Sequence, residues 1–285
     1  MRLQNQTAIV TGASRSIGRA IALRCAAEGA RVALAARSQR LLQATERAIQ
    51  DQGGEALVVP TDVMDYTSVE RLVSITRERL GPVDLLANVA GRLAAIGPSW
   101  EADPTHWWLD VSVNLLGVFH LSRAVIPGMR DRGCGRIVNM VGGGTRGPFP
   151  FASGYACSKA AVMRFTETLA TELSVTGSAI KVFALSPGFV RTGMTEQFTD
   201  TEAGRTWMGR LSRRLQSGET DPPEDAAEMV VTLAAGELDE LHGRYLRSPQ
   251  DLEQLELLRE HGQAIAEGGA RTLRVQRPGA WGRSG

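Results

Sequence analysis

The sequence predicts an α/β fold, a doubly wound parallel sheet of about seven strands with helices on both faces. Three observations predict this fold. Short apolar runs alternate with longer segments of helical periodicity, a glycine-rich turn joins the first strand to the first helix, and no Pro/Gly/Ser linker or internal repeat divides the chain. Strands that alternate with helices of ten or more residues are typical of parallel βαβ units.

Seven runs are short, apolar and bounded by turn residues, as buried strands are. The predicted strands are 7–10, 31–36, 56–59, 84–87, 136–141, 180–185 and 244–246. Between them, apolar residues recur at helical spacing, and glycine or proline ends several of the segments. The predicted helices are 17–27, 39–52, 68–80, 106–132 and 154–175.

Two stretches depart from this alternation. Residues 192–218 mix polar and apolar side chains over a length unusual for a connection, which favours a substrate lid. A surface helical excursion is the alternative. Residues 251–285 are expected to form a helical, then flexible tail, so the predicted main domain covers 1–250 and includes the lid.

Composition narrows the function classes. The 285 residues carry a formal net charge of +1 with acidic and basic residues interspersed, which favours neither a nucleic acid nor an acidic partner. Cys25, Cys134 and Cys157 are widely separated, with no spacing typical of a metal site, which favours a reduced intracellular protein. We expect neither a signal peptide nor a membrane span, and therefore a cytoplasmic location.

A tyrosine and a lysine stand four residues apart at the start of the helix predicted from 154. Tyr155 and Lys159 would then lie on one helical face, where a nearby ammonium favours the ionised phenol. Such a pair can act as a phenolic acid or base near neutral pH. A tyrosine and a lysine at this spacing more often belong to an ordinary half-exposed helix face. The pair therefore indicates a catalytic site only together with the surrounding motifs.

The turn after the first strand reads Thr11-Gly12-Ala13-Ser14-Arg15-Ser16-Ile17-Gly18. In this position glycines let the backbone approach a pyrophosphate, and the following helix supplies N–H donors. Together with Asn88-Val89-Ala90-Gly91, Asn114, the Tyr155/Lys159 pair and Pro187-Gly188, this turn resembles the short-chain dehydrogenase/reductase family over residues 5–247. The resemblance implies a Rossmann fold and a nicotinamide dinucleotide.

The resemblance also implies roles for individual residues. Tyr155 would exchange a proton with the substrate oxygen, Lys159 would lower the tyrosine pKa and bind the nicotinamide ribose, and Asn114 would hold a water. A larger set of residues is expected to contact the cofactor. They are Gly12, Ser14, Arg15, Ser16, Ile17, Gly18, Arg37, Asp62, Val63, Asn88, Ala90, Gly91, Tyr155, Lys159, Pro187, Gly188, Val190 and Thr192. The resemblance also implies a homodimer or homotetramer, paired through helices 110–132 and 154–175.

The residues at the end of the second strand predict whether the site prefers NAD or NADP(H). A site selective for NAD carries an acid there, on the ribose 2′-hydroxyl. This chain reads Ala35-Ala36-Arg37-Ser38, and Arg37, with Arg15 on the same side, can pair with a 2′-phosphate. We therefore expect NADP(H). The alternative is that both arginines are solvated surface charges.

The chain departs from the family pattern at two positions. Ser16 replaces the middle glycine of the turn, which we expect cofactor binding to tolerate. Gly142 stands where the family usually has a serine that binds the substrate oxygen, thirteen residues before Tyr155. Losing one such donor typically costs about 2.7–4 kcal/mol in the transition state. Thr145 or a water is a candidate substitute, and Ser153 is more simply explained as a helix N-cap.

These observations predict an NADP(H)-dependent oxidoreductase that interconverts a ketone and a secondary alcohol. Gly142, Gly143, Thr145, Phe149 and Met194 are the candidate substrate residues. The apolar residues Pro148, Phe149, Phe151, Met194 and Trp207 favour a hydrophobic or aromatic small molecule. Gly142 also motivates two alternatives. One is a dinucleotide-binding protein with little redox turnover, and the other uses Tyr155 for non-redox proton transfer such as dehydration or isomerisation.

Overall fold

The computed structural model describes residues 1–268 and 270–273, and in this range it confirms the predicted fold. The strands form one parallel sheet in the order β3-β2-β1-β4-β5-β6-β7. Their bounds are β1 Thr7–Thr11, β2 Arg31–Ala36, β3 Ala56–Pro60, β4 Leu85–Asn88, β5 Arg136–Met140, β6 Lys181–Ser186 and β7 Tyr245–Arg247. The order reverses direction between β1 and β4, which is where open α/β sheets bind ligands.

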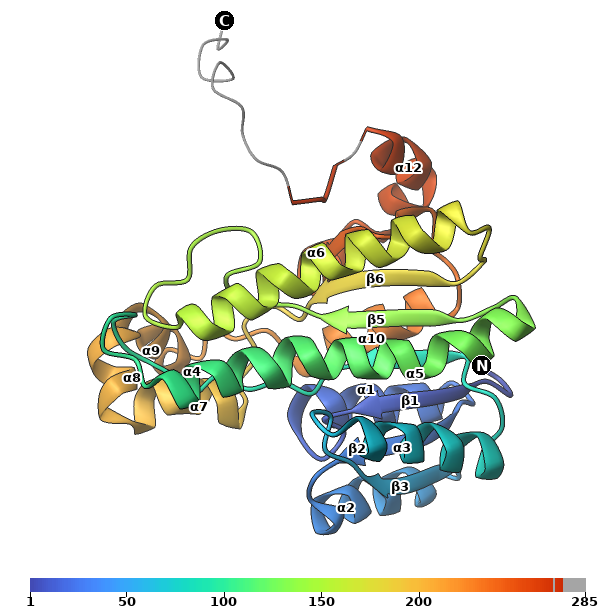
Figure 1. Ribbon diagram of the computed structural model, residues 1–285, viewed down its shortest axis with the longest axis horizontal. Helices are drawn as coiled ribbons and strands as arrows, with labels where there is room; N and C mark the ends of the chain where they lie inside the picture. The colour runs from blue at the N-terminus through green and yellow to red at the C-terminus, as the bar shows by residue number, and fades with distance from the viewer. Residues whose placement is uncertain (269, 274–285) are drawn as a thin grey trace, which may run out of the picture.

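Helices cover both faces of the sheet. Figure 1 shows α5 and α6 in front of β5 and β6 and α10 behind them. The bounds on the main body are α1 Ser16–Ala27, α2 Gln39–Gln50, α3 Tyr66–Arg79, α4 Pro104–Val111, α5 Gly117–Arg132, α6 Ser153–Val175 and α10 Pro223–Ala234. Helix α10 is an element that the sequence patterns did not single out, although Pro222 is its N-cap, Pro223 is its first residue and acidic residues follow in its first turn.

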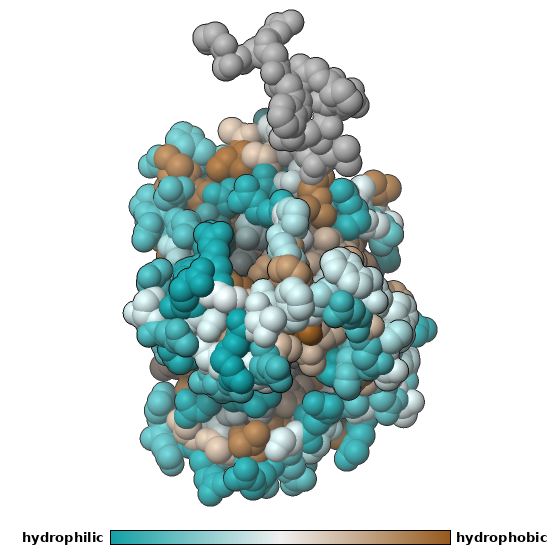
Figure 2. Space-filling model, turned by 90° about the vertical axis from the view of Figure 1, so that its left-hand side faces the viewer, coloured by the Kyte–Doolittle hydropathy of each residue, from teal (hydrophilic) through white to brown (hydrophobic). Residues whose placement is uncertain are grey.

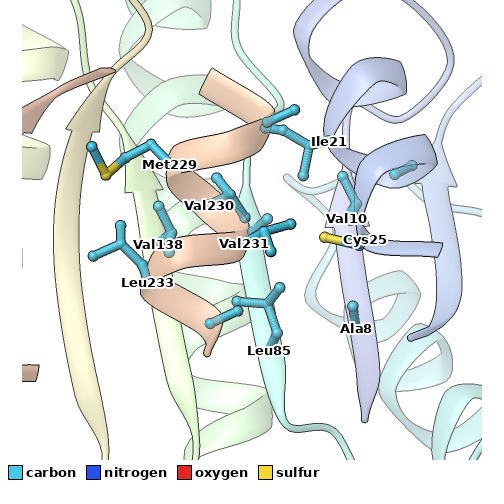
Figure 3. Packing of buried hydrophobic residues seen from close by; sticks show 14 of the residues in the cluster. Ala8, Val10, Ile21, Cys25, Leu85, Val138, Met229, Val230, Val231 and Leu233 are labelled. Carbon is cyan, nitrogen blue, oxygen red and sulfur yellow. The ribbon is translucent and has the colours of Figure 1, made fainter. Parts of the chain in front are cut away.

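The larger core cluster lies between the sheet and the helices α1 and α10. In Figure 3, Val230 and Val231 of α10 face the strands that carry Val138 and Leu85, and Ile21 lies on the neighbouring α1. All five of these side chains are fully buried. This contact holds β1, β4 and β5 in place, and their carboxyl ends carry the candidate site.

The stretch 192–218 forms three short helices beyond the carboxyl end of the sheet, α7 Gly193–Asp200, α8 Glu202–Trp207 and α9 Gly209–Gln216 (Figure 1). After β7 the chain continues through α11 Ser248–Glu253 and α12 Leu255–Glu267, which agrees with the helical part of the predicted tail. Leu258 of α12 is buried in the core cluster, so this part of the tail packs on the domain. The predicted flexible end, from 274, lies outside the described residues.

The helix predicted at 106–132 has an irregular centre. It begins at Pro104 behind the N-cap Asp103 and contains a π-helical turn, Ser112–Leu116, between α4 and α5. Our expectation that no apolar stretch reaches spanning length is wrong here, because Pro104–Arg132 is long and apolar enough, with a mean hydropathy of 1.4 over its most apolar window. The helix nevertheless buries Val118, Leu121 and Val125 within the domain, as a core helix does.

Candidate active site

The glycine-rich turn brings the ends of β1 and β4 together. The Thr11 hydroxyl accepts hydrogen bonds from the backbone N–H groups of Val89 (2.9 Å) and Ala90 (3.1 Å). Gly12 has a φ of +67°, and a Cβ at this position would lie 3.1 Å from the Ala90 nitrogen. A Cβ at Gly18 would collide with the Gly12 carbonyl oxygen. These close approaches require glycine and leave the turn backbone accessible at the amino end of α1.

Ser16 adopts a left-handed conformation with a φ of +47°. The left-handed region costs an L-residue about 1–2 kcal/mol relative to the right-handed one. The turn therefore keeps the backbone geometry that a glycine would adopt freely, although a serine stands there. Gly91 completes the cradle, since a Cβ on it would lie 3.2 Å from Asn114 Oδ1 and 3.7 Å from Lys159 Nζ.

The predicted catalytic residues meet beside this cradle. Tyr155 and Lys159 lie one turn apart on α6, with the Lys159 Nζ atom 5.6 Å from the centre of the Tyr155 ring. Lys159 is 4% exposed and donates a hydrogen bond to the Met140 carbonyl at the end of β5 (2.9 Å). Helix α6 thus places the phenol and the ammonium at the carboxyl ends of the central strands.

Burial dominates the electrostatics of this pair. It raises the pKa of Tyr155 to about 12 and lowers the pKa of Lys159 to about 8. The expectation that Lys159 lowers the tyrosine pKa is therefore not met in this structure, because desolvation of the buried phenol raises its pKa. At neutral pH the phenol is protonated.

Asn114 lies in the π-helical turn, a type of irregularity that often marks functional sites. Its Nδ2 group donates to the Arg92 carbonyl (2.8 Å) and to Ser158 Oγ (2.9 Å), and its Oδ1 accepts from the Arg92 N–H (2.8 Å). Asn114 therefore fastens the loop after β4 to α6. This anchoring role was not predicted from the sequence, which offered only the water-binding role.

Gly142 lies directly against the tyrosine hydroxyl. A Cβ at this position would be 2.5 Å from Tyr155 Oη, closer than real side chains approach. The phenol therefore occupies the space that a side chain at 142 would need. The sequence identified the missing serine, but the position of the hydroxyl in the vacated space is visible only in three dimensions.

The candidate substitute hydroxyls are engaged elsewhere. Thr145 is buried, and its hydroxyl donates to the Gly142 carbonyl (2.7 Å) and accepts from the Gly142 N–H (3.2 Å). It lines a neighbouring cavity instead of the one beside Tyr155, so its hydroxyl does not take the place of the missing serine beside the phenol in this structure. Ser153 accepts from Trp107 Nε1 (3.0 Å), and the N-cap of α6 is Ala152, so the N-cap interpretation of Ser153 is wrong.

A cavity of about 300 Å³ opens beside Tyr155 under α7 and α9. Figure 2 looks onto this end of the molecule, where hydrophobic residues show between hydrophilic ones. Of the predicted substrate residues, Gly142, Gly143, Phe149 and Met194 line the cavity. Of the predicted cofactor residues, Ile17, Pro187, Gly188, Val190 and Thr192 line it as well. The lid and the loop after β5 thus enclose one mostly apolar space.

Sequence reasoning missed several residues of the lining. Leu93, Val141, Ser186, Phe189, Tyr245 and Arg247 were not predicted, and Thr195, Phe198 and Leu211 were predicted only as part of the lid 192–218. Phe189 lies inside the predicted Pro187–Thr192 segment and could have been included on that ground. Tyr245 and Arg247 belong to β7, which ends one residue later than the predicted strand 244–246, so Arg247 was not assigned to the strand. Nothing in the local sequence indicated that Tyr245 or Arg247 lines the cavity.

Other predicted cofactor residues carry structural contacts. Asn88 is buried and donates to Asn139 Oδ1 (2.8 Å), beneath the site. Asp62 Oδ1 accepts from the Met64 N–H (3.0 Å), and Val63 packs against Gly117. Thr192 caps α7 and accepts from the Thr195 N–H (3.2 Å), so its hydroxyl is shared with the lid helix.

The two predicted phosphate ligands, Arg15 and Arg37, are both exposed, and neither has a carboxylate partner within residues 1–268 and 270–273. A Cβ at Gly193 would lie 3.5 Å from Arg15 Nη1, so the Arg15 side chain extends toward the start of α7. Ser14 lies between Gly12 and Arg15 and is half-buried. The cradle of Gly12, Gly18 and Gly91, with a free guanidinium at the end of β2, fits a dinucleotide.

Comparison with known proteins agrees with this geometry. The family model for short chain dehydrogenases matches residues 6–203. A putative ketoacyl reductase of Streptomyces coelicolor is 39% identical over 238 residues, covering 80% of this chain and 90% of that protein. A short chain dehydrogenase of Pseudocercospora fijiensis is 35% identical over 276 residues, covering 95% and 87%.

Solved structures show the same relationship. The chain is similar to a variant of actinorhodin polyketide ketoreductase with NADPH, with a TM-score of 0.77 and 34% identity over 88% of this chain and 98% of that one. A metagenomic short-chain oxidoreductase in complex with NADP has a TM-score of 0.68 and 29% identity, covering 82% and 92%. The fold is that of an oxidoreductase. This chain belongs to the short-chain dehydrogenase/reductase family.

Proposed function

We propose that this protein is an NADPH-dependent reductase of ketones that carry an apolar or aromatic group. The observation that carries the proposal is the Tyr155 phenol, which opens onto an apolar cavity beside Lys159 and the glycine cradle. A relative described as a putative ketoacyl reductase and a similar ketoreductase structure with NADPH support it. When bound, the cofactor supplies the hydride.

In this proposal Tyr155 is the general acid. Because burial raises its pKa to about 12, the phenol holds its proton at neutral pH and can donate it to the developing alkoxide of the substrate. Lys159 would bind the ribose of the cofactor, and Asn114 would hold the loop after β4 in place. Phe149 and Met194 would contact the apolar part of the substrate.

The test is oxidation of NADPH by a panel of aromatic and aliphatic ketones, followed through the absorbance of the reduced nicotinamide. We expect turnover that falls at least about a hundredfold in Tyr155→Phe, because a positioned proton donor contributes about 10²–10⁴ in rate. The Phe variant keeps the ring and its packing. Full turnover by Tyr155→Phe would overturn the assigned role.

The preference for NADP(H) is a second part of the proposal, supported by Arg37 and the lack of an acid at the end of β2. Arg37→Glu should weaken NADPH binding at least about tenfold and leave NADH binding equal or tighter, because it exchanges a charge-assisted phosphate contact for repulsion. Arg40→Glu, three residues further along, is the matched control. Equal effects of the two substitutions on NADPH binding would mean that Arg37 is a solvated surface charge that does not contact the 2′-phosphate.

A non-redox role is the rival function, and Gly142 is the specific observation behind it. It predicts that the protein binds NADPH but that no ketone of the panel oxidises it. Dehydration or isomerisation by Tyr155 would instead show product formation without a net change in NADPH. Product analysis by mass spectrometry beside the absorbance measurement separates these outcomes.

We further propose a homodimer or homotetramer formed through α5 and α6. Leu116, the last residue of the π-helical turn, and Phe119, in the first turn of α5, are 40% and 44% exposed and give this face an apolar character. Light scattering of the purified protein tests the oligomeric state, and Phe119→Lys should shift it toward the monomer. A monomeric wild type would reject the proposal. The cytoplasmic location stays a prediction, and cell fractionation tests it.

A further inference from the structure

A second cavity, of about 370 Å³, lies next to the catalytic one. The loop after β5, strand β7, helix α11 and residues 271–273 surround it. Its lining includes Arg146, Tyr245, Arg247, Gln250, Asp251 and Arg271. Tyr245 and Arg247 also line the catalytic cavity, so these two side chains form a wall that both spaces share.

The register of β7 explains this shared wall. Tyr245 and Arg247 are two residues apart in an edge strand and lie on the same face, while Leu246 between them is fully buried in the core cluster. Arg247 pairs with Ser186 of β6, which itself lines the catalytic cavity. The position of Arg247 beside the catalytic cavity is therefore fixed by the pairing of β7 with β6.

The charges in the second cavity are unbalanced. Asp251 is the acidic residue of the lining, and it is already engaged, because its Oδ2 accepts from Arg271 Nη1 (2.7 Å) and from the Arg247 backbone N–H (2.6 Å). The guanidinium groups of Arg146 and Arg247 have no hydrogen-bond or carboxylate partner among residues 1–268 and 270–273. The Arg146 guanidinium stands 5.6 Å from the centre of the Tyr245 ring.

Two guanidinium groups that lack a hydrogen-bond or carboxylate partner in the described part of the chain, beside one polar cavity, are suited to a carboxylate or phosphate, which a guanidinium binds through paired hydrogen bonds. We propose that the second cavity is a subsite for an anionic group of the substrate. A ketone acid would place its apolar part against Phe149 and Met194, its carbonyl at Tyr155, and its carboxylate or phosphate at Arg247 and Arg146. This substrate class rests on the proposed reductase function.

A binding experiment tests the subsite without any turnover. 4-Phenylbutyrate and 4-phenylbutanamide differ only in the charge and chemistry of their end group, and calorimetry gives their affinities. We expect the wild type to bind the acid at least about tenfold more tightly than the amide. Arg247→Gln and Arg146→Gln should reduce this preference, and Arg71→Gln, an exposed arginine on α3 away from both cavities, should preserve it. Equal affinities of the wild type for acid and amide would overturn the subsite.

Added inorganic phosphate distinguishes the two possible sources of the anion. If phosphate competes with 4-phenylbutyrate and leaves 4-phenylbutanamide unaffected, the site takes the acid group of the substrate itself. If phosphate instead strengthens binding of the amide, the site takes a separate anion, and the assignment to the substrate is overturned. Saturating the protein with NADPH beforehand keeps phosphate out of the cofactor site.

Turnover then separates this inference from the proposed function. With 4-oxo-4-phenylbutanoate and its amide as ketones, the acid-over-amide preference in kcat/KM should fall about tenfold in Arg247→Gln, mainly through KM of the acid. If neither ketone is reduced but the binding preference for the acid holds, the reductase function fails and the anionic subsite stands. If both are reduced with no acid preference, the function stands and the subsite is overturned.

Discussion

The tyrosine hydroxyl at the candidate site occupies the space that a side chain at position 142 would fill. A Cβ on Gly142 would lie 2.5 Å from Tyr155 Oη, so any larger residue displaces the phenol or the loop. Gly142 therefore does more than remove a serine hydroxyl from the site, because the space that it leaves determines where the Tyr155 hydroxyl lies. A serine at position 142 would add a second hydrogen-bond donor to the site, whereas glycine leaves the space that the Tyr155 hydroxyl occupies.

We predict that Gly142→Ala reduces ketone turnover at least about tenfold by displacing the Tyr155 phenol from its productive position. Gly142→Ser should displace the phenol similarly but add a donor, so it should be more active than the Ala variant. Steady-state kinetics with one ketone of the panel provides the comparison. Wild-type activity in Gly142→Ala would show that the phenol does not depend on this space.

The left-handed conformation of Ser16 leads to a prediction about stability. Its φ of +47° costs about 1–2 kcal/mol, while glycine loses about 0.5–1 kcal/mol more in conformational entropy on folding. Ser16→Gly should therefore raise the unfolding free energy by up to about 1.5 kcal/mol. Ser14→Gly, whose φ is not positive, is the matched control and should lower it. Urea denaturation measures both, and a loss of stability in Ser16→Gly would mean that the serine hydroxyl makes a compensating contact.

At the scale of elements, the end of α4 holds the loop that follows β4. Asp110 is fully buried and forms an ion pair with Arg92, and its Oδ2 also accepts from the N–H groups of Ala94 (2.9 Å) and Ala95 (2.9 Å). Asn114, one turn further along, bonds the same loop at Arg92. Leu93 of this loop lines the catalytic cavity, so the helix shapes the site through the loop.

We predict that Asp110→Asn lowers the unfolding free energy by about 3–5 kcal/mol, because it breaks a buried pair and turns an amide N–H toward backbone donors. It should also raise KM for the ketone, since Leu93 loses its support. Asp103→Asn, at the exposed N-cap of the same helix, keeps a capping oxygen and should change stability by less than about 1 kcal/mol. Similar losses in both variants would reject the role of Asp110 in the loop.

At the scale of the whole molecule, a buried lysine makes stability depend on pH. Burial lowers the pKa of Lys159 to about 8 from its ordinary value of 10.5, so between these values the unfolded chain binds more protons than the folded one. Stability therefore rises with pH across this window, and the full penalty applies below about pH 8. A shift of this size corresponds to about 3 kcal/mol at neutral pH.

We predict that Lys159→Met, although inactive, is more stable than the wild type at pH 7 and that its advantage shrinks as the pH rises to 9. Other groups titrate in both proteins alike, so the difference between the two unfolding free energies isolates Lys159. Chemical denaturation at pH 7, 8 and 9 provides the values. An advantage that stays constant with pH would contradict the lowered pKa.

The fold and the central motifs were predictable because they depend on local pattern. Alternating strands and helices, the turn from Thr11 to Gly18, and the spacing of Tyr155 and Lys159 are all visible in short windows of the chain. Helix α10 was missed although its residues are apolar, because it follows the lid with no strand between them. The N-cap assignment of Ser153 was wrong, and Thr145 does not replace the serine beside Tyr155, because a hydroxyl near a site in sequence can bond to the nearby backbone or to a neighbouring tryptophan.

The sequence by itself determined the class of fold and the family, since each follows from periodicity or from residue types at fixed spacing. Only the tertiary structure decided which side chains share a cavity. Arg247 joins Tyr155 in the lining although 92 residues separate them in the chain, because parallel strands end at one edge of the sheet. The same packing buries Lys159 and places the Tyr155 hydroxyl against Gly142. Burial and distance between remote residues are properties that no short window of sequence contains.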